Sequence, residues 1–162
     1  MWRSTEDKVM KYLLAFLAFS LAGTAAWAEN VQLTSKVQVE RVVKDDKGQD
    51  KIVLEEPKVV TPGEKLVFTL NYKNVGTAPA QDFVITNPVP GAVSYAGGEA
   101  DGSVVSVDGG TNWGTLASLT VAGTDGQRRA AQAADVTHVR WTFPQPIPVG
   151  AEGKLTFRGT VK

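Results

Sequence analysis

The single histidine, His138, is the residue on which any acid–base catalysis in this chain would depend. A serine hydrolase also needs a nucleophile, and the chain contains no Gly-x-Ser-x-Gly sequence that could present one. His138 alternates with the apolar residues Val139 and Trp141, so it is expected on the solvent side of a strand with Arg140 and Thr142. A lone histidine without cysteine also lacks the several nitrogen or sulfur ligands of a zinc site. The sequence therefore predicts neither an enzyme nor a zinc protein.

Carboxylates are the other groups that could carry chemistry. The acidic pairs at 45–46 and 55–56 stand beside lysines, which is typical of solvated loops and not of two acids facing each other across a cleft. Residues 108–112, Asp-Gly-Gly-Thr-Asn, place oxygen ligands in a glycine-rich loop and superficially resemble a calcium loop. They lack the further carboxylates and the terminal bidentate Glu of that loop. We interpret them as a turn and predict no metal and no cofactor.

Two aromatic residues are candidates for contact with a ligand or a partner. Trp113 follows a glycine-rich segment, and an exposed loop tryptophan can stack on a sugar or on another protein. The alternative is that Trp113 folds back over the end of the domain. Tyr95 and the polar loops around Asp101 and Asp108 would complete such a ligand site.

Charge and cysteine content exclude several classes of function. The 162 residues carry 17 basic and 17 acidic side chains, and removal of residues 1–28 leaves 14 basic and 15 acidic ones, a net charge of −1. Such a balance gives no electrostatic basis for binding nucleic acid or an anionic membrane. The absence of cysteine excludes disulfides, thiolate metal sites and a lipidated cysteine.

The first 28 residues have the pattern of a cleavable signal peptide. Lys8 and Lys11 precede an uninterrupted apolar stretch at 12–22, and Ala26 and Ala28 form the small-x-small sequence that signal peptidase recognises. The apolar stretch is shorter than the roughly 20 residues that span a bilayer, which favours cleavage over anchoring. Residues 1–9 are unusual for a signal peptide and are interpreted as an over-long gene start. The sequence thus predicts an exported protein, periplasmic or extracellular, that has no membrane span after cleavage.

From about residue 31 onward, apolar and polar residues alternate with the period of two that is typical of β-strands. In the clearest example, 66–73, Leu66, Phe68, Leu70 and Tyr72 share one face. We also expect Trp141 to point into the core. Only residues 128–134 read as a short helix. Turn sequences rich in Gly, Pro, Asn and Asp separate the strands, so residues 29–162 are predicted to form one antiparallel sandwich or barrel. The strands are expected at Val31–Lys44, 51–56, 66–73, 81–86, 103–107, 116–121, 138–143 and 154–162.

The first of these strands is unusually long. Val31–Lys44 comprises 14 residues, whereas strands usually run about 5–6. Such a strand would overrun a single sandwich, so it is expected either to bend between two sheets or to project and pair elsewhere. Domain swapping and strand donation both use segments of this kind.

The middle of the chain resembles a known family. Residues 62–76 and 77–91, followed by Tyr95-Ala-Gly-Gly98, combine a Pro-Gly turn, an alternating strand, an Asn-x-Gly turn and a second strand. This order resembles the conserved-repeat domain of bacterial and archaeal surface proteins, family eleven of the domains of unknown function. The resemblance covers 58–161, and Asn87 stands where the family often has Asp. It implies an immunoglobulin-like sandwich of about seven to nine strands outside the cell, with no catalytic residues to transfer. The single copy leads us to expect a small periplasmic or secreted subunit.

Two functions remain open on the sequence. The first is a structural or protein-interaction module of the cell envelope that contacts another protein or a second copy of itself, as the long first strand and the absence of an active site suggest. The alternative is a module that binds envelope carbohydrate or another ligand through Trp113 and Tyr95.

Overall fold

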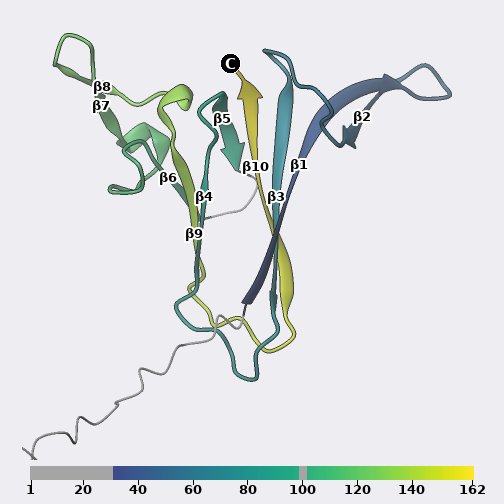
Figure 1. Ribbon diagram of the computed structural model, residues 1–162, viewed down its shortest axis with the longest axis vertical. Coiled ribbons are helices and arrows are strands. Elements are labelled where there is room, and N and C mark those ends of the chain that lie inside the picture. The colour runs from purple at the N-terminus through teal and green to yellow at the C-terminus, as the bar shows by residue number, and fades with distance from the viewer. Residues whose placement is uncertain (1–30, 99–101) are drawn as a thin grey trace, which may run out of the picture.

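The computed structural model describes residues 31–98 and 102–162, and within them the chain forms β-strands and two short 3-10 helices (Figure 1). The helices are η1, Leu116–Ser118, and η2, Ala133–Asp135. Every strand pair is antiparallel, which confirms the predicted all-β class. The strands are β1 Val31–Lys44, β2 Asp50–Glu55, β3 Lys65–Asn74, β4 Val84–Pro88, β5 Val93–Gly98, β6 Ser103–Ser106, β7 Thr120–Ala122, β8 Arg128–Ala130, β9 His138–Thr142 and β10 Glu152–Val161.

Eight of these strands form two sheets that face each other as a sandwich. The larger sheet has the order β2-β1-β3-β10-β5, and the smaller has the order β4-β9-β6. The β7–β8 hairpin stands apart from both sheets. In Figure 1 it projects on one side of the molecule and the β1–β2 hairpin projects on the other.

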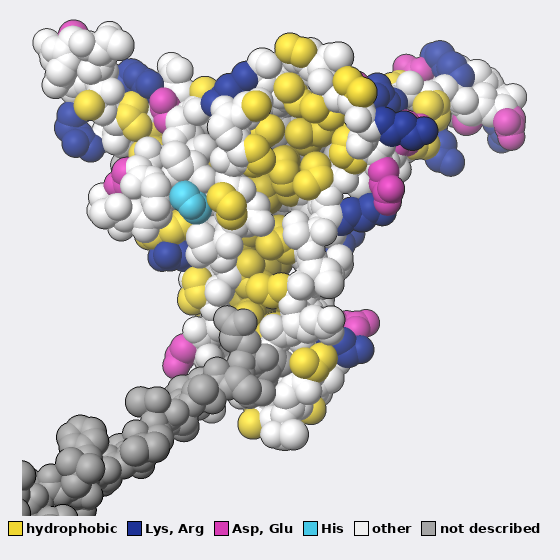
Figure 2. Space-filling view, viewed as in Figure 1, with side chains coloured by type: hydrophobic (Ala, Val, Ile, Leu, Met, Phe, Trp, Pro, Cys, Tyr) yellow, Lys and Arg dark blue, Asp and Glu magenta, His cyan; other side chains and the backbone are white. Residues whose placement is uncertain are grey.

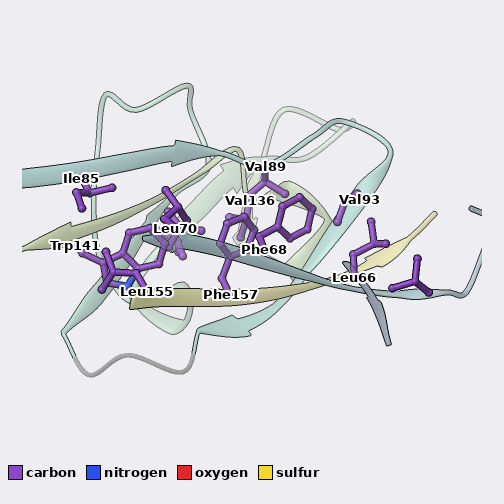
Figure 3. Close-up of a cluster of buried hydrophobic side chains, with 13 residues drawn as sticks. Leu66, Phe68, Leu70, Ile85, Val89, Val93, Val136, Trp141, Leu155 and Phe157 are labelled. Atoms are coloured by element: carbon purple, nitrogen blue, oxygen red, sulfur yellow. The ribbon is translucent and has the colours of Figure 1, made fainter. Parts of the chain in front are cut away.

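The core lies between the two sheets and is built by the alternation that the sequence shows. Leu66, Phe68 and Leu70 of β3 are all buried, and Phe157 of β10 stacks on Phe68 with ring centroids 4.4 Å apart. Trp141 reaches the same cluster from the opposite sheet, 6.2 Å from Phe157 between ring centroids (Figure 3). The predictions for β3 and Trp141 are therefore confirmed. Burial of these large apolar side chains is the main favourable term for folding in a chain without disulfides.

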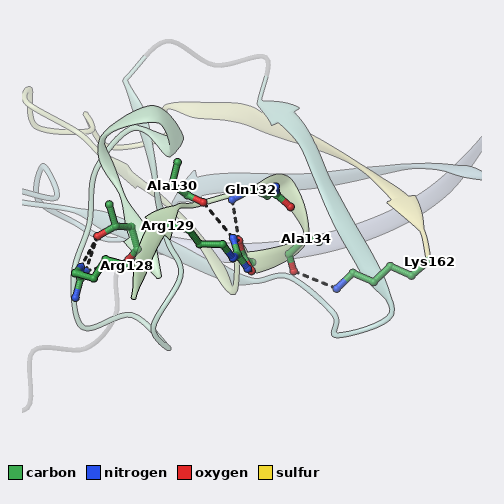
Figure 4. A network of polar contacts seen from close by, with 8 residues as sticks. Arg128, Arg129, Ala130, Gln132, Ala134 and Lys162 are labelled. Carbon is green, nitrogen blue, oxygen red and sulfur yellow. Dashed lines mark hydrogen bonds and ion pairs between the residues drawn. The ribbon is translucent and has the colours of Figure 1, made fainter. Parts of the chain in front are cut away.

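The predicted helix at 128–134 is wrong. Arg128–Ala130 is strand β8, which pairs with β7, and the chain then turns into the 3-10 helix η2. The Arg129 guanidinium donates two hydrogen bonds of 2.7 and 2.8 Å to the Asp135 carboxylate, and Arg128 Nε donates to the Thr120 hydroxyl (2.8 Å; Figure 4). These contacts hold the segment extended, so tertiary structure overrides the helix propensity of its alanines.

Strand β5, like β8, is a strand that the sequence did not predict. Its last residues, Gly97 and Gly98, read as a turn, yet Val93–Gly98 pairs with β10. Gly97 has a φ of +104°, so the strand ends in a conformation that favours glycine.

The predicted strand at 116–121 is only partly right, because its first half forms η1 and only the second half enters β7.

Strand β1 does project, and it changes partner along its length. Val31–Glu40 pairs with β3, while only Val39–Lys44 pairs with β2. Residues 31–38 therefore have a strand on one side only and form the edge of the larger sheet. The expectation that β1 extends beyond the sandwich is confirmed.

Some sequence predictions fall outside the described residues. These include the signal-peptidase recognition residues Ala26 and Ala28, and Asp101 of the proposed ligand loop. Among the described residues, no helix is long and apolar enough to cross a membrane.

Candidate functional site: an apolar seam beside a free strand edge

Trp113 folds back over the outer face of the smaller sheet. Its indole N–H donates a 2.8 Å hydrogen bond to the Gly110 carbonyl, and the Arg140 guanidinium lies 3.6 Å from the ring centroid. The His138 ring meets Trp113 edge-on, 6.3 Å away. One face of the indole is therefore already covered by a cation, and that face offers no stacking platform to a sugar.

Tyr95 lies in a different part of the molecule. It is in β5 of the larger sheet, half-buried, with its ring centroid 6.4 Å from that of Phe157. Burial raises the pKa of the Tyr95 phenol, and a hydrogen bond with Ser103 partly offsets this. Since Tyr95 faces the core of one sheet and Trp113 covers the outer face of the other, the structure does not bring the two together into one site.

The loop that follows Ser106 is held by Asp108. The Asp108 carboxylate accepts hydrogen bonds from the Asn112 backbone and side-chain N–H groups (2.9 and 2.6 Å), the Thr111 backbone N–H (3.1 Å) and the Ser106 hydroxyl (2.7 Å). These bonds, above all the one from the Asn112 backbone, lower the pKa of Asp108 to about 2. The described residues contain no group of three or more acidic, histidine or cysteine side chains that could hold a metal ion. The carboxylate thus works as the organiser of a turn.

We expect the protein to lose stability in acid as Asp108 and Asp135 become protonated. The Arg129 hydrogen bonds lower the pKa of Asp135 to about 2 as well. A carboxyl whose folded-state pKa lies below its unfolded value stabilises the fold above the unfolded pKa, near 3.8, and loses this contribution as pH falls towards 2. Urea unfolding from about pH 5 to about pH 2 should show a steeper loss in the native protein than in the Asp108→Asn/Asp135→Asn variant. Asp46→Asn, in the exposed β1–β2 turn, controls for loss of charge. Equal slopes in all three proteins would contradict the assignment.

The most prominent apolar surface is a cleft between the two sheets, which we call the seam. In Figure 2 hydrophobic side chains form a continuous strip along the middle of the molecule, between the two sheets. The cleft has a volume of about 310 Å³, and every side chain that lines it is apolar. Three of these side chains come from the central strands β3 and β10 of the larger sheet, and two come from its strands β1 and β5. The other four come from the loops after β2 and β4. The residues are Val37, Pro57, Val60, Leu66, Phe68, Pro90, Ala92, Val93 and Val161.

A free strand edge lies directly beside the seam. Val37 belongs both to the lining of the cleft and to the part of β1 that has no strand on its outer side. Further along the same edge, Leu33 leaves 48% of its surface exposed. The seam therefore combines an apolar cleft with a stretch of β1 that pairs with a strand on one side only.

This arrangement restricts the chemistry of the site. No titratable residue lines the seam, so it cannot carry acid–base or nucleophilic catalysis. A carbohydrate site needs polar groups that converge on the hydroxyls, and the lining offers no polar side chain. An extended polypeptide matches both parts, because its backbone can pair with β1 and its alternate side chains can enter the cleft.

Most of these residues carry no signal in the sequence that marks them as a site. The unusual length of Val31–Lys44 pointed to β1, but Pro57, Val60 and Pro90 read as ordinary loop residues. Comparisons with models of protein families, with curated proteins and with solved structures found no match to this chain. The resemblance to the conserved-repeat surface domain thus stays a prediction.

Proposed function

We propose that the protein is an exported, non-catalytic interaction module of the cell envelope, and that it binds an extended segment of a partner protein at the seam. The observation that carries this proposal is the coincidence of an apolar cleft with the free edge of β1 at Val37. Strand addition supplies affinity through main-chain hydrogen bonds and specificity through pockets for every second side chain.

Export is part of the same proposal. It is supported by the basic, apolar and small-x-small segments that end at Ala28. An immunoglobulin-like arrangement of the two sheets is supported by the antiparallel order β2-β1-β3-β10-β5 against β4-β9-β6 and by the family resemblance over 58–161. The carbohydrate-binding alternative has less support, since Arg140 covers one face of Trp113 and Tyr95 lies on the other sheet.

The proposal is tested with a fluorescent peptide of about ten alternating valines and threonines, which can form an amphipathic strand. We expect its fluorescence anisotropy to rise on addition of the native protein. Val60→Glu places a charge in the apolar cleft at a position that is exposed without a ligand, so it should weaken binding by about tenfold or more.

Two controls separate strand addition from general stickiness. Val149→Glu changes a valine that is exposed and does not line the seam, and it should bind as the native protein does. A peptide with two central prolines cannot complete the ladder and should bind weakly. The proposal fails if no alternating peptide binds, or if Val60→Glu and Val149→Glu behave alike.

A further inference from the structure

The β1–β2 hairpin carries a second apolar surface, on the face opposite the seam. Val42 stands directly across from Ile52, and Leu54 stands across from Glu40. Because side chains alternate between faces, Val42, Ile52 and Leu54 share one face of the hairpin. They leave 64%, 60% and 45% of their surfaces exposed. We call this set of three residues the hairpin patch.

Strand β2 also ends the larger sheet. It pairs with β1 on one side and is the last strand in the order β2-β1-β3-β10-β5. Exposed apolar edge strands tend to pair with another chain unless charge, proline or a bulge prevents it. The hairpin therefore has both requirements for pairing with a strand, an open edge and apolar side chains next to it.

The order of charges in β2 identifies the strand that fits. Residues 51–55 read Lys-Ile-Val-Leu-Glu, so opposite charges stand two residues before and two residues after Val53. If two copies of β2 lie antiparallel with Val53 opposite Val53, each Lys51 faces Glu55 of the second copy and each Ile52 faces Leu54 of the second copy. Opposite charges directly across an antiparallel pair stabilise it. The two hairpin patches then join into one apolar surface.

The residues at the two ends of this β2–β2 pairing are acidic, but their charges are already balanced by lysines of the same copy. The pairing places Asp50 opposite Glu56 of the second copy, which would repel if both were unpaired. Within each copy, however, Lys44 forms an ion pair with Asp50, and Lys36 lies 3.5 Å from Glu56. Lys51 makes no ion pair within the described part of the chain, so it is free for the second copy. Glu55 has only an exposed contact with Arg41, 3.5 Å away, and Arg41 holds Glu64 more closely at 2.7 Å.

We propose that the protein self-associates into a two-fold symmetric dimer through antiparallel pairing of β2 with β2 of a second copy. The same patch serves both subunits, as in an isologous interface, so the assembly closes at two copies. This inference goes beyond the proposed function, because it uses the edge and face of the hairpin and leaves the seam available.

Analytical ultracentrifugation of the purified protein over a range of concentrations tests the dimer with charge-reversal variants. Lys51→Glu alone gives four acidic side chains at the two central pairs, and Glu55→Lys alone gives four basic ones. Each should weaken the dimer by about tenfold or more. An equimolar mixture of the two variants pairs acid with base at both positions, so it should regain the native dimer affinity as a heterodimer.

Lys47→Glu and Asp46→Lys, both exposed in the turn between β1 and β2, are the matched controls and should leave the dimer intact. A native protein that stays monomeric at all concentrations overturns the proposal. So does a dimer that survives both single reversals, or a mixture of the variants that stays monomeric. Binding of the alternating peptide at the seam is measured on the same variants and should be unchanged, so failure of one proposal can be told from failure of the other.

Discussion

Replacement of Phe157 by alanine is expected to reduce the free energy of unfolding by about 3–5 kcal/mol. Phe157 is fully buried, and its ring stacks on Phe68 in the same sheet. It also lies within 6.2 Å of the Trp141 ring in the opposite sheet and 6.4 Å of the Tyr95 ring. Alanine at this position would leave a cavity at the point where both sheets meet, and the surrounding rings are too rigid to fill it completely.

Urea or thermal unfolding followed by circular dichroism measures this effect. Phe157→Leu keeps most of the apolar volume and should lose less stability than Phe157→Ala. Val149→Ala, at an exposed position, should stay within about 0.5 kcal/mol of the native protein. A loss below about 1 kcal/mol for Phe157→Ala would show that the two sheets do not depend on this ring.

The sequence predicts the strands best where one face is buried and the other is solvated. Leu66, Phe68 and Leu70 alternate with Thr69 and Asn71, and this alternation reports burial directly because successive side chains point to opposite faces. The same rule places His138 and Arg140 on the outer face of β9, where the structure has them in contact with Trp113.

The rule fails where contacts distant in sequence decide the conformation. Nothing local marks Gly98 as a strand residue, but a Cβ there would lie 3.1 Å from the Ser103 hydroxyl, so glycine allows β5 and β6 to approach closely. The extended conformation at Arg129 depends on its hydrogen bonds with Asp135. Neither contact can be read from propensity or periodicity.

The candidate sites could be predicted only in part, for a related reason. The seam lies where β1 has no neighbouring strand on one side. Alternation of apolar and polar residues predicts that a segment is a strand, but it does not predict which edge of that strand stays unpaired. The opposite charges of Lys51 and Glu55 are visible in the sequence. They acquire a meaning only once β2 is known to end its sheet and to project from the sandwich.

Asn74 carries the second large expected effect, because its side chain joins two loops that connect the sheets. The amide is fully buried and donates hydrogen bonds to the carbonyls of Ile147 (2.8 Å) and Ala78 (3.0 Å), while its oxygen accepts one from the Gly76 N–H (2.9 Å). The Asn-x-Gly turn that the sequence shows at 74–76 is therefore also a clamp on the distant β9–β10 connection.

Asn74→Ala should reduce the free energy of unfolding by about 3 kcal/mol, since it removes the side chain that satisfies the Ala78 carbonyl and the Gly76 N–H, and it also removes one of the two hydrogen bonds to the Ile147 carbonyl. Asn71→Ala is the matched control: it removes the same side chain from the same strand, three residues earlier on the exposed outer face, and should cost less than about 0.5 kcal/mol. Chemical denaturation gives both values. The backbone N–H of Ala80 donates a hydrogen bond to the Ile147 carbonyl and so joins the same two loops. This amide should exchange with solvent faster in Asn74→Ala than in the native protein, and its exchange rate should not change in Asn71→Ala. Similar losses in the two variants would mean that the buried amide does not clamp the loops, and that the sheets are held together by the apolar core alone.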